Sequence, residues 1–249
     1  MSQNACRCAA ALVYYGKAVA SYGFCQNILG KTQYKYPNLI IRLTADYKSK
    51  EQFEVVPIPI NRGIVGYRVF LVRKEMQPDF KEVYSLSDIQ VKRLKAGQGR
   101  WTDVDILRDN GINVIVGMSY EGLFGMLMEK RFDFFPRGIN EAFEEFETRK
   151  ERYPEMQVEE TLALHYPLPR VLVTNKGNTA VAERIERGLK AIIADGTHRK
   201  IWKKYNQKWI EKSKLENRKI IYLKNPYALP NLPYDQDGYW YQPGETFQP

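Results

Sequence analysis

Two short apolar segments of this chain have nearly the same pattern, Arg68-Val-Phe-Leu-Val-Arg-Lys74 and Arg170-Val-Leu-Val-Thr-Asn-Lys176. Each begins with an arginine, lies close to a preceding tyrosine, and continues as an aliphatic and β-branched run that favours a buried strand. About a hundred residues of alternating strand and helix patterns lie between them. This arrangement predicts a chain that enters a second lobe through the first segment and returns through the second.

The region between the paired segments alternates strand and helix signals. Short apolar runs predict strands, whereas capping residues, glycines and a 3.6-residue period predict helices. The expected strands are 93–96, 112–116 and 132–135, the last ended by Pro136, and the expected helices follow Ser85, a capping box at Thr102–Asp105, Ser119 and Asn140. Outside this region, we expect a helix at 9–21, a strand at 38–43 and two helices between Val181 and Trp209, the second capped by Thr197. Such alternation predicts mainly parallel sheets flanked by helices.

Composition leaves several classes of function open. The chain has 249 residues and a formal charge of +9, which fits a nucleic-acid surface, an anionic ligand or a basic exported protein. The basic residues are spread along the sequence rather than gathered in blocks, which disfavours nucleic acid. Cys6, Cys8 and Cys25 all lie near the N-terminus, and only two histidines are present. We therefore expect neither a metal site nor a cofactor.

The N-terminal region does not have the pattern of a secretory signal. Its apolar stretch at 9–13 is too short for the hydrophobic part of such a signal. Nor does an apolar run of the chain reach the ~20 residues needed to span a bilayer. The sequence alone predicts either a cytoplasmic protein or a reading frame whose true start lies further upstream.

Five further stretches together resemble a known family. They are Gly66–Lys74, Gly97–Asp103, Tyr120–Phe124, Arg131–Gly138 and Ala182–Leu189. The combination resembles the bacterial extracellular solute-binding proteins of family 3, the type 2 periplasmic binding proteins that serve the uptake of polar amino acids. The resemblance covers roughly residues 45–245, and the first 45 residues do not show the strand and helix with which that family begins.

The resemblance implies an α/β, two-lobed type 2 periplasmic-binding-protein-like fold with two hinge crossovers. Lobe 1 would comprise residues 1–68 and 170–249, with an atypical and incomplete N-terminal part and a tail rich in proline and aromatic residues from about 217. Lobe 2 would comprise residues 69–169. The implied function is that of a monomeric, non-enzymatic, periplasmic or extracytoplasmic receptor for a small polar, carboxylate-bearing ligand. Its partner would be the membrane permease of an ABC-type uptake system, and nucleic acid would not be a partner.

Candidate ligand-binding residues lie where predicted strands end and helices begin, because free N–H groups at helix N-termini attract anions. The first such turn offers Arg100, Trp101 and Thr102, with the indole as an apolar wall. The alternative for this turn is an ordinary helix cap. The next helix start offers Tyr120 and also Glu121, whose carboxylate could pair with a ligand ammonium. The alternative for Glu121 is a favourable acid in the first helical turn.

Arg137 and Gly138 directly follow the third expected strand. An arginine held by a preceding proline can clamp a carboxylate with two parallel hydrogen bonds, so Arg137 is the principal candidate. In the family that the sequence resembles, this region often carries an acid for the ligand amine, so the resemblance implies that an arginine here indicates a ligand richer in negative charge. The alternative is a structural salt bridge to Glu141 or Asp133. Arg68, in the first paired segment, is a further candidate that would otherwise pair across the crossover.

Two other functions stay open on the sequence. One is a ligand-sensing or regulatory domain of the same fold, which residue patterns do not distinguish from a transport receptor. The other is nucleic-acid binding through the basic surface, which would be sensitive to salt. An enzyme is not expected, because no nucleophile, metal set or acid–base pair assembles in the sequence. His165, which lies beside the second paired segment, is expected to be a packed side chain rather than a general base.

Overall fold

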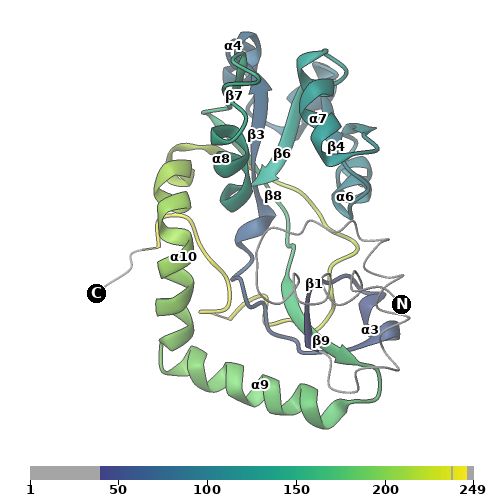
Figure 1. The fold of residues 1–249 in the computed structure, drawn as a ribbon, viewed down its shortest axis with the longest axis vertical. Helices are drawn as coiled ribbons and strands as arrows, with labels where there is room; N and C mark the ends of the chain where they lie inside the picture. The colour runs from purple at the N-terminus through teal and green to yellow at the C-terminus, as the bar shows by residue number, and fades with distance from the viewer. Residues whose placement is uncertain (1–39, 237, 246–249) are drawn as a thin grey trace, which may run out of the picture.

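A computed structural model describes residues 40–236 and 238–245, which form two β-sheets. Figure 1 shows the larger sheet and its helices in the upper half of the molecule and the smaller sheet in the lower half. The expected helix at 9–21 and the three cysteines lie outside the described residues. Within the described ranges, no helix is both long and apolar enough to cross a membrane.

The larger sheet has seven strands, and all but one of them run in the same direction. Their order is β10-β8-β3-β6-β4-β5, and β7 also pairs with β3. β3 runs antiparallel to β6, β7 and β8, whereas β4 is parallel to β5 and β6 and β10 is parallel to β8. The strands are β3 (Tyr67–Arg73), β4 (Lys95–Gln98), β5 (Asn113–Val116), β6 (Phe134–Gly138), β7 (Met156–Val158), β8 (Leu162–His165) and β10 (Lys219–Tyr222). This confirms the expected α/β class with a mainly parallel sheet.

Helices cover both faces of the larger sheet. On one face, Phe70 and Val72 of β3 share a buried cluster with residues of α4 (Gln77–Lys81), α5 (Leu86–Val91) and α6 (Asp103–Asp109). On the other face, Leu71 packs with α7 (Tyr120–Met128), and Val69 packs with α8 (Ile139–Glu147). β3 is buried along its whole length because both of its faces are covered. The continuous apolar run of the first paired segment reflects this position.

The smaller sheet is antiparallel and has the second paired segment at its centre. Its order is β1-β9-β2, with bounds Ile40–Thr44, Arg170–Asn175 and Phe53–Val55. Val171 and Val173 face a cluster that includes Leu229 and Leu232 of the tail, whereas Leu172 packs on the opposite face towards α9 (Thr179–Ala194). The remaining short helices are α3 (Ser49–Gln52), η1 (Ile64–Gly66), η2 (Lys74–Met76) and η3 (Leu215–Asn217). The two paired segments therefore belong to different sheets.

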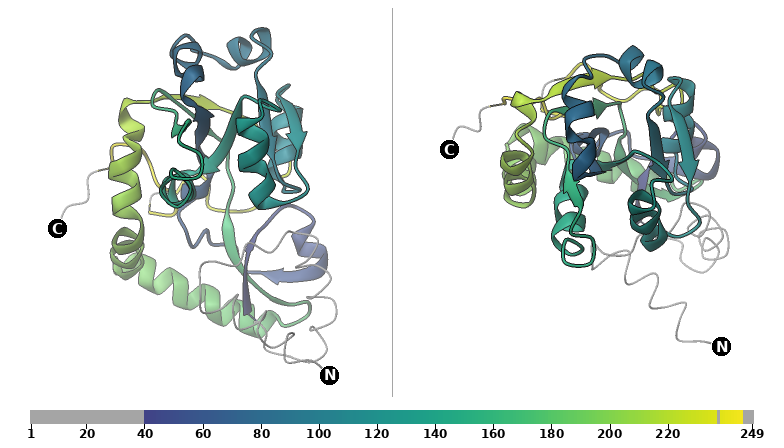
Figure 2. Two further views of the ribbon diagram at one scale, coloured as in Figure 1. Left: turned by 45° about the horizontal axis from the view of Figure 1, so that its top comes forward. Right: turned by 90° about the horizontal axis from the view of Figure 1, so that it is seen from above.

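The first two connections between the sheets are called the crossings here, and they lie side by side. The first runs from β2 to β3, and the second runs from β8 to β9. The Ile60 N–H donates to the Arg170 carbonyl at 2.9 Å, and the Tyr166 N–H donates to the Gly66 carbonyl at 3.3 Å. After β9, the long helix α10 (Thr197–Ser213) extends along one side of the molecule from the smaller towards the larger sheet (Figures 1 and 2). It leads to β10, which joins the larger sheet beside β8.

Four local predictions need correction. Thr102 has helical backbone angles and makes no capping hydrogen bond, so the expected capping box there is wrong. Asn140 does not cap α8 but lies within it, and the Glu141 carboxylate instead accepts the Gly138 N–H at 3.2 Å. Pro136 does not end β6, because the pairing with β3 continues past it, with Arg137 opposite Val69 and Gly138 opposite Arg68. Thr197 does not cap α10 but is its first residue, and the N-cap is Gly196.

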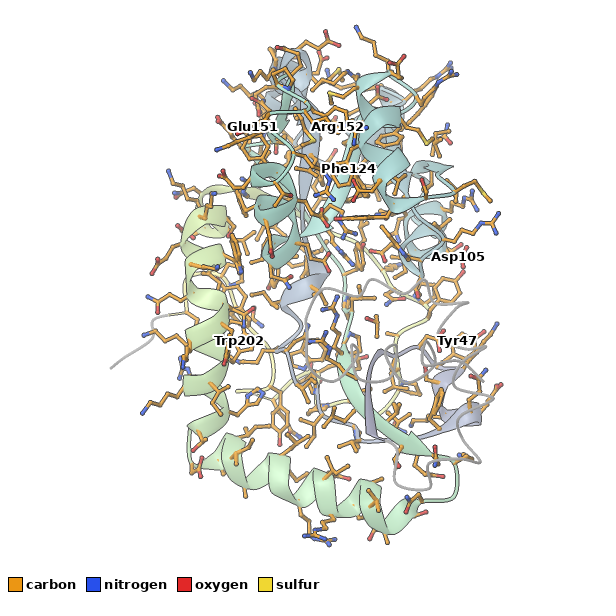
Figure 3. The ribbon with its side chains drawn as sticks, viewed as in Figure 1. Tyr47, Asp105, Phe124, Glu151, Arg152 and Trp202 are labelled. Atoms are coloured by element: carbon orange, nitrogen blue, oxygen red, sulfur yellow. The ribbon has the colours of Figure 1, made fainter. Side chains whose placement is uncertain are left out.

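The tail binds the first crossing through Arg62, whose side chain is only 2% exposed. Its guanidinium donates to the carbonyls of Gly238 and Trp240 at 3.1 and 3.0 Å and to the Glu245 carboxylate at 2.9 Å. The Tyr241 N–H returns a bond to the Arg62 carbonyl at 2.8 Å. Trp202 reaches inwards from α10 to this region (Figure 3), where it lies 4.8 Å from the Arg62 guanidinium.

Candidate functional site

The three helices that follow β4, β5 and β6 all begin at one edge of the larger sheet. These strands are parallel, so their carboxyl ends lie together, and the N-termini of α6, α7 and α8 lie beside them. Figure 1 shows this edge directed towards the smaller sheet. Free N–H groups and polar side chains gather at such edges, which is why ligands of open α/β sheets bind there.

On one face of this edge, Arg68 forms a buried pair with Asp103. Arg68 Nη2 lies 2.6 Å from Asp103 Oδ1, which also accepts the Tyr166 hydroxyl at 2.5 Å. Tyr166 belongs to the second crossing, so the pair connects the start of β3, the start of α6 and that crossing. Burial would lower the pKa of Arg68, but Asp103 raises it, which keeps the guanidinium charged. The alternative predicted for Arg68, pairing across the crossover, matches these contacts.

On the other face, Arg137 is 5% exposed and is clamped by carboxylates of its own chain. Its Nε and Nη2 donate to Glu145 at 2.8 and 2.6 Å, and Nη2 lies 3.3 Å from Glu141. The guanidinium also lies 4.7 Å from the centre of the Trp101 ring, a cation–π distance. Tyr120 donates its hydroxyl to Glu145 at 2.7 Å. The structural salt bridge to Glu141 that was the alternative for Arg137 is therefore present, whereas Asp133 pairs with Arg73.

Glu141 lies between these two pairs, and its carboxylate forms ion pairs with three arginines. Its carboxylate is 3.0 Å from Arg170 Nη2, 3.3 Å from Arg137 Nη2 and 3.6 Å from Arg68 Nη1. Arg170 begins β9, so its bond to Glu141 joins the smaller sheet to α8. With Asp103 and Glu145, Glu141 balances the three arginine charges. The cluster remains accessible at this point, because the Glu141 side chain is 21% exposed.

Glu141 should make stability depend on pH in acid. Burial raises its pKa, but Arg137, Arg170 and Arg68 outweigh burial and lower the pKa from 4.5 to about 2. Because the folded-state pKa is below the ordinary value, the ionised group stabilises the fold above pH 4.5, and this contribution is lost as the pH falls towards 2. Glu141→Gln should therefore be less stable than the wild type at pH 6, and the difference should shrink between pH 4.5 and 2.

Chemical denaturation at several pH values measures this difference. Glu151→Gln, at an exposed position in the loop before β7 (Figure 3), removes the same charge outside the cluster and is the matched control. A constant difference between Glu141→Gln and the wild type from pH 6 to 2 would contradict the assignment.

The remaining predicted site residues lie around this cluster. Arg100 is exposed, and its Nη2 lies 3.1 Å from Met118 Sδ. Thr102 is half-buried at the start of α6, and Gly138 is buried at the end of β6. Glu121 is exposed and pairs with Arg149 at 2.5 Å, so its carboxylate already has a cationic partner. The structure brings Trp101, Tyr120 and Arg137 together, whereas the Glu121 side chain belongs to a separate ion pair outside this group.

Sequence reasoning missed several members of the cluster. Asp103, Glu145 and Arg170 were not selected, although Glu141 and Glu145 stand at the i,i+4 spacing that places both on one helix face. That spacing directly after Arg137 was the available signal. Arg170 belongs to an element distant in sequence, so its contact with Glu141 depends on the tertiary fold.

Neither a metal-binding cluster nor a catalytic histidine stands out among the residues that the structure describes. No group of three or more His, Cys, Asp or Glu residues there could hold a metal ion. The His165 ring lies 4.2 Å from the Tyr67 ring and 5.4 Å from the Tyr222 ring, and burial lowers its pKa to about 4. His165 is thus the packed, neutral side chain expected from the sequence.

The two sheets, the paired crossings and this edge define a class of fold, that of the two-lobed type 2 periplasmic binding proteins. No family model matches the sequence, and the search of curated proteins gives no match. Solved structures of amino-acid-binding proteins do match the fold. These matches support the resemblance seen in the sequence. Because the sequence identities are low, they show similarity of fold and not of function.

Three of these structures illustrate the likeness. The GluR0 ligand binding core in complex with L-glutamate is 12% identical, with a TM-score of 0.53 over 81% of this chain and 87% of that chain. The ancestral amino acid-binding protein AncCDT-1, a precursor of cyclohexadienyl dehydratase, is 15% identical, with a TM-score of 0.51 over 73% of each chain. An arginine 3rd transport system periplasmic binding protein from Legionella pneumophila is 11% identical, with a TM-score of 0.50 over 71% and 76%.

Proposed function

We propose that this protein is a non-enzymatic, monomeric solute-binding protein that encloses a small, amino-acid-like ligand between two lobes. The observation that carries this proposal is the arginine–carboxylate cluster at the edge of the larger sheet, joined to the smaller sheet by Arg170 and Glu141. It lies where the fold class predicts a ligand, and it contains both charge types that a zwitterion needs. The fold of amino-acid-binding neighbours supports the same conclusion.

The proposed hinge consists of the two crossings, between β2 and β3 and between β8 and β9, whereas β10, which falls within the predicted bounds of lobe 1, pairs with β8 of the larger sheet. β10 belongs to the larger sheet and Leu229 and Leu232 of the tail pack on the smaller one, so the C-terminal part would couple the two sheets during closure. Closure would require ligand groups to compete with internal partners, since Arg137 and Arg170 are both paired in the structure. A ligand carboxylate would replace Glu141 on an arginine, and a ligand ammonium would pair with the released carboxylate.

The acids of the cluster support binding rather than catalysis. Asp103, Glu141 and Glu145 each pair with an arginine, and a pKa of about 2 leaves Glu141 ionised near neutral pH. Such a carboxylate has no proton to donate as a general acid, and its low pKa makes it a weak general base. We therefore propose a receptor of an uptake system, with a membrane permease as partner, acting outside the cytoplasm.

A ligand-sensing domain is the second candidate function. The GluR0 ligand binding core, which matches over 87% of its length, supports it, because that neighbour is named as a binding core rather than a transport component. Reconstitution with a permease encoded beside this protein separates the two functions. Ligand-stimulated ATP hydrolysis would favour transport, and its absence with a ligand-binding protein would favour sensing.

A thermal-shift screen of the twenty amino acids and small organic acids tests the proposed binding. A ligand present at 100 times its Kd should stabilise the folded protein by about 2.7 kcal/mol. Trp101→Ala should reduce the shift, because the indole would form the apolar wall of the site and packs on Arg137. Tyr205→Ala, which removes an aromatic ring that is 65% exposed on α10, is the control and should keep the full shift. A screen without any stabilising compound would overturn the proposal.

A further inference from the structure

The candidate site has more positive than negative charge. Three arginines of the cluster, Arg68, Arg137 and Arg170, are balanced by three carboxylates. A fourth arginine, Arg42, approaches the cluster from β1 of the smaller sheet. Among the described residues, no carboxylate lies within salt-bridge distance of Arg42, so its positive charge is not balanced inside the cluster.

The strand register places Arg42 beside Arg170. In the antiparallel pair of β1 and β9, Arg42 lies opposite Leu172 and Thr44 lies opposite Arg170. Side chains two residues apart point to the same face of a strand, so Arg42 and Arg170 are diagonal neighbours on one face. Arg42 is exposed as a residue, but partial desolvation of its guanidinium and then Arg170 lower its pKa, whereas Glu141 raises it. Arg42 therefore lies within electrostatic range of both members of the bridge between the sheets.

A second cation lies at the edge of the larger sheet. Arg100 lies in the turn between β4 and α6, and its Nη2 lies 3.1 Å from the thioether sulfur of Met118. A thioether is a weak acceptor and carries no charge. The excess of positive charge is thus contributed by both the smaller sheet and the edge of the larger one.

We propose that the ligand is an anionic amino acid, with two carboxylates and one ammonium, and that Arg42 determines this specificity by receiving the second carboxylate. This inference rests on the proposed function. A neutral zwitterion would leave the charge of Arg42 unbalanced on closure, and a cationic ligand would add to it. An anionic ligand of net charge −1 neutralises it. The first carboxylate would take the place of Glu141 on Arg170, and the ammonium would pair with the Glu141 carboxylate.

Isothermal titration with isosteric ligand pairs tests the inference on the full chain. L-glutamate and L-glutamine differ by a charge at nearly constant shape, as do L-aspartate and L-asparagine, and L-arginine reverses the sign. We expect the acidic member of one pair to bind about ten- to a hundredfold more tightly than its amide, the range given by one charge-assisted hydrogen bond. L-arginine should bind more weakly than either.

Arg42→Gln identifies the residue responsible. It should weaken binding of the acidic ligand about tenfold or more and leave binding of the amide within about twofold, so that the discrimination disappears. Arg187→Gln, which removes an exposed arginine of α9, lowers the net charge equally and should preserve the discrimination.

The outcomes separate the inference from the proposed function. Tight binding of a neutral or basic amino acid would overturn the inference and leave the proposed function standing. No binding of any amino acid or small organic acid would overturn both. Unchanged discrimination in Arg42→Gln, with the variant folded by circular dichroism, would remove Arg42 from the site and overturn its assigned role.

Discussion

Arg137→Ala is expected to lower the free energy of unfolding by about 3–5 kcal/mol, the cost of breaking a buried ion pair by removing one partner. The guanidinium bonds Glu145 through two nitrogens and also contacts Glu141, and its removal leaves the Glu145 carboxylate buried without a cation. Trp101 would also lose the cation against which its ring packs. The variant is therefore unsuitable as a simple binding mutant.

A double variant separates the loss of the pair from the loss of packing. Arg137→Met combined with Glu145→Leu removes both charges and keeps similar volumes, and such replacements are often neutral or stabilising. We expect the double variant to regain most of the stability lost in Arg137→Ala. Urea denaturation of the wild type, both single variants and the double variant gives the coupling free energy. A double variant as unstable as Arg137→Ala would show that packing, not charge, accounts for the loss.

Gly66→Ala is expected to destabilise the fold by about 3 kcal/mol, at the upper end of typical overpacking costs. A Cβ atom at residue 66 would lie 2.3 Å from the Tyr166 carbonyl oxygen and 3.5 Å from the Leu168 nitrogen. Both atoms are backbone atoms of the second crossing, so no side-chain rotation can make room. The two crossings would have to move apart, which would also weaken the bond between the Tyr166 N–H and the Gly66 carbonyl.

Gly188→Ala provides the matched control. This glycine lies within α9, and a Cβ atom there would meet nothing within 4 Å. Alanine favours a helix over glycine, so the control should be stabilised by about 0.5–1 kcal/mol. Thermal unfolding of the two variants and the wild type compares the same chemical change at the crossing and on a free helix. Equal effects of the two substitutions would mean that the crossings are not in close contact.

The larger sheet was predictable because its signals are local. Ser119 caps α7 and Ser85 caps α5 as expected, and Gly111 follows the end of α6 with a positive φ of 74°. Short apolar runs between such signals favour buried strands. The boundaries moved by one to three residues, because partners across the sheet decide where pairing ends.

The candidate site was predictable only in part. Turns between strands and helices identified Trp101, Tyr120 and Arg137 as neighbours, since the carboxyl ends of parallel strands meet at one edge. The partners of Arg137 could not be ranked from sequence, because choosing between Glu141, Glu145 and Asp133 requires side-chain geometry. Arg42 and Arg170 were missed for another reason: their approach to the cluster depends on how the smaller sheet sits against the larger one.

The contact between the tail and the first crossing provides a natural optical probe. The chain has four tryptophans. The Trp240 ring lies directly over Gly63, Trp202 bonds the Asn61 carbonyl at 2.8 Å, and Trp101 lies at the candidate site. Movement of the crossing would change the surroundings of these indoles. Intrinsic fluorescence should therefore follow domain motion in the unlabelled protein. Replacing Trp101 by phenylalanine would remove the signal of the candidate site and keep the signals of Trp202 and Trp240 beside the first crossing.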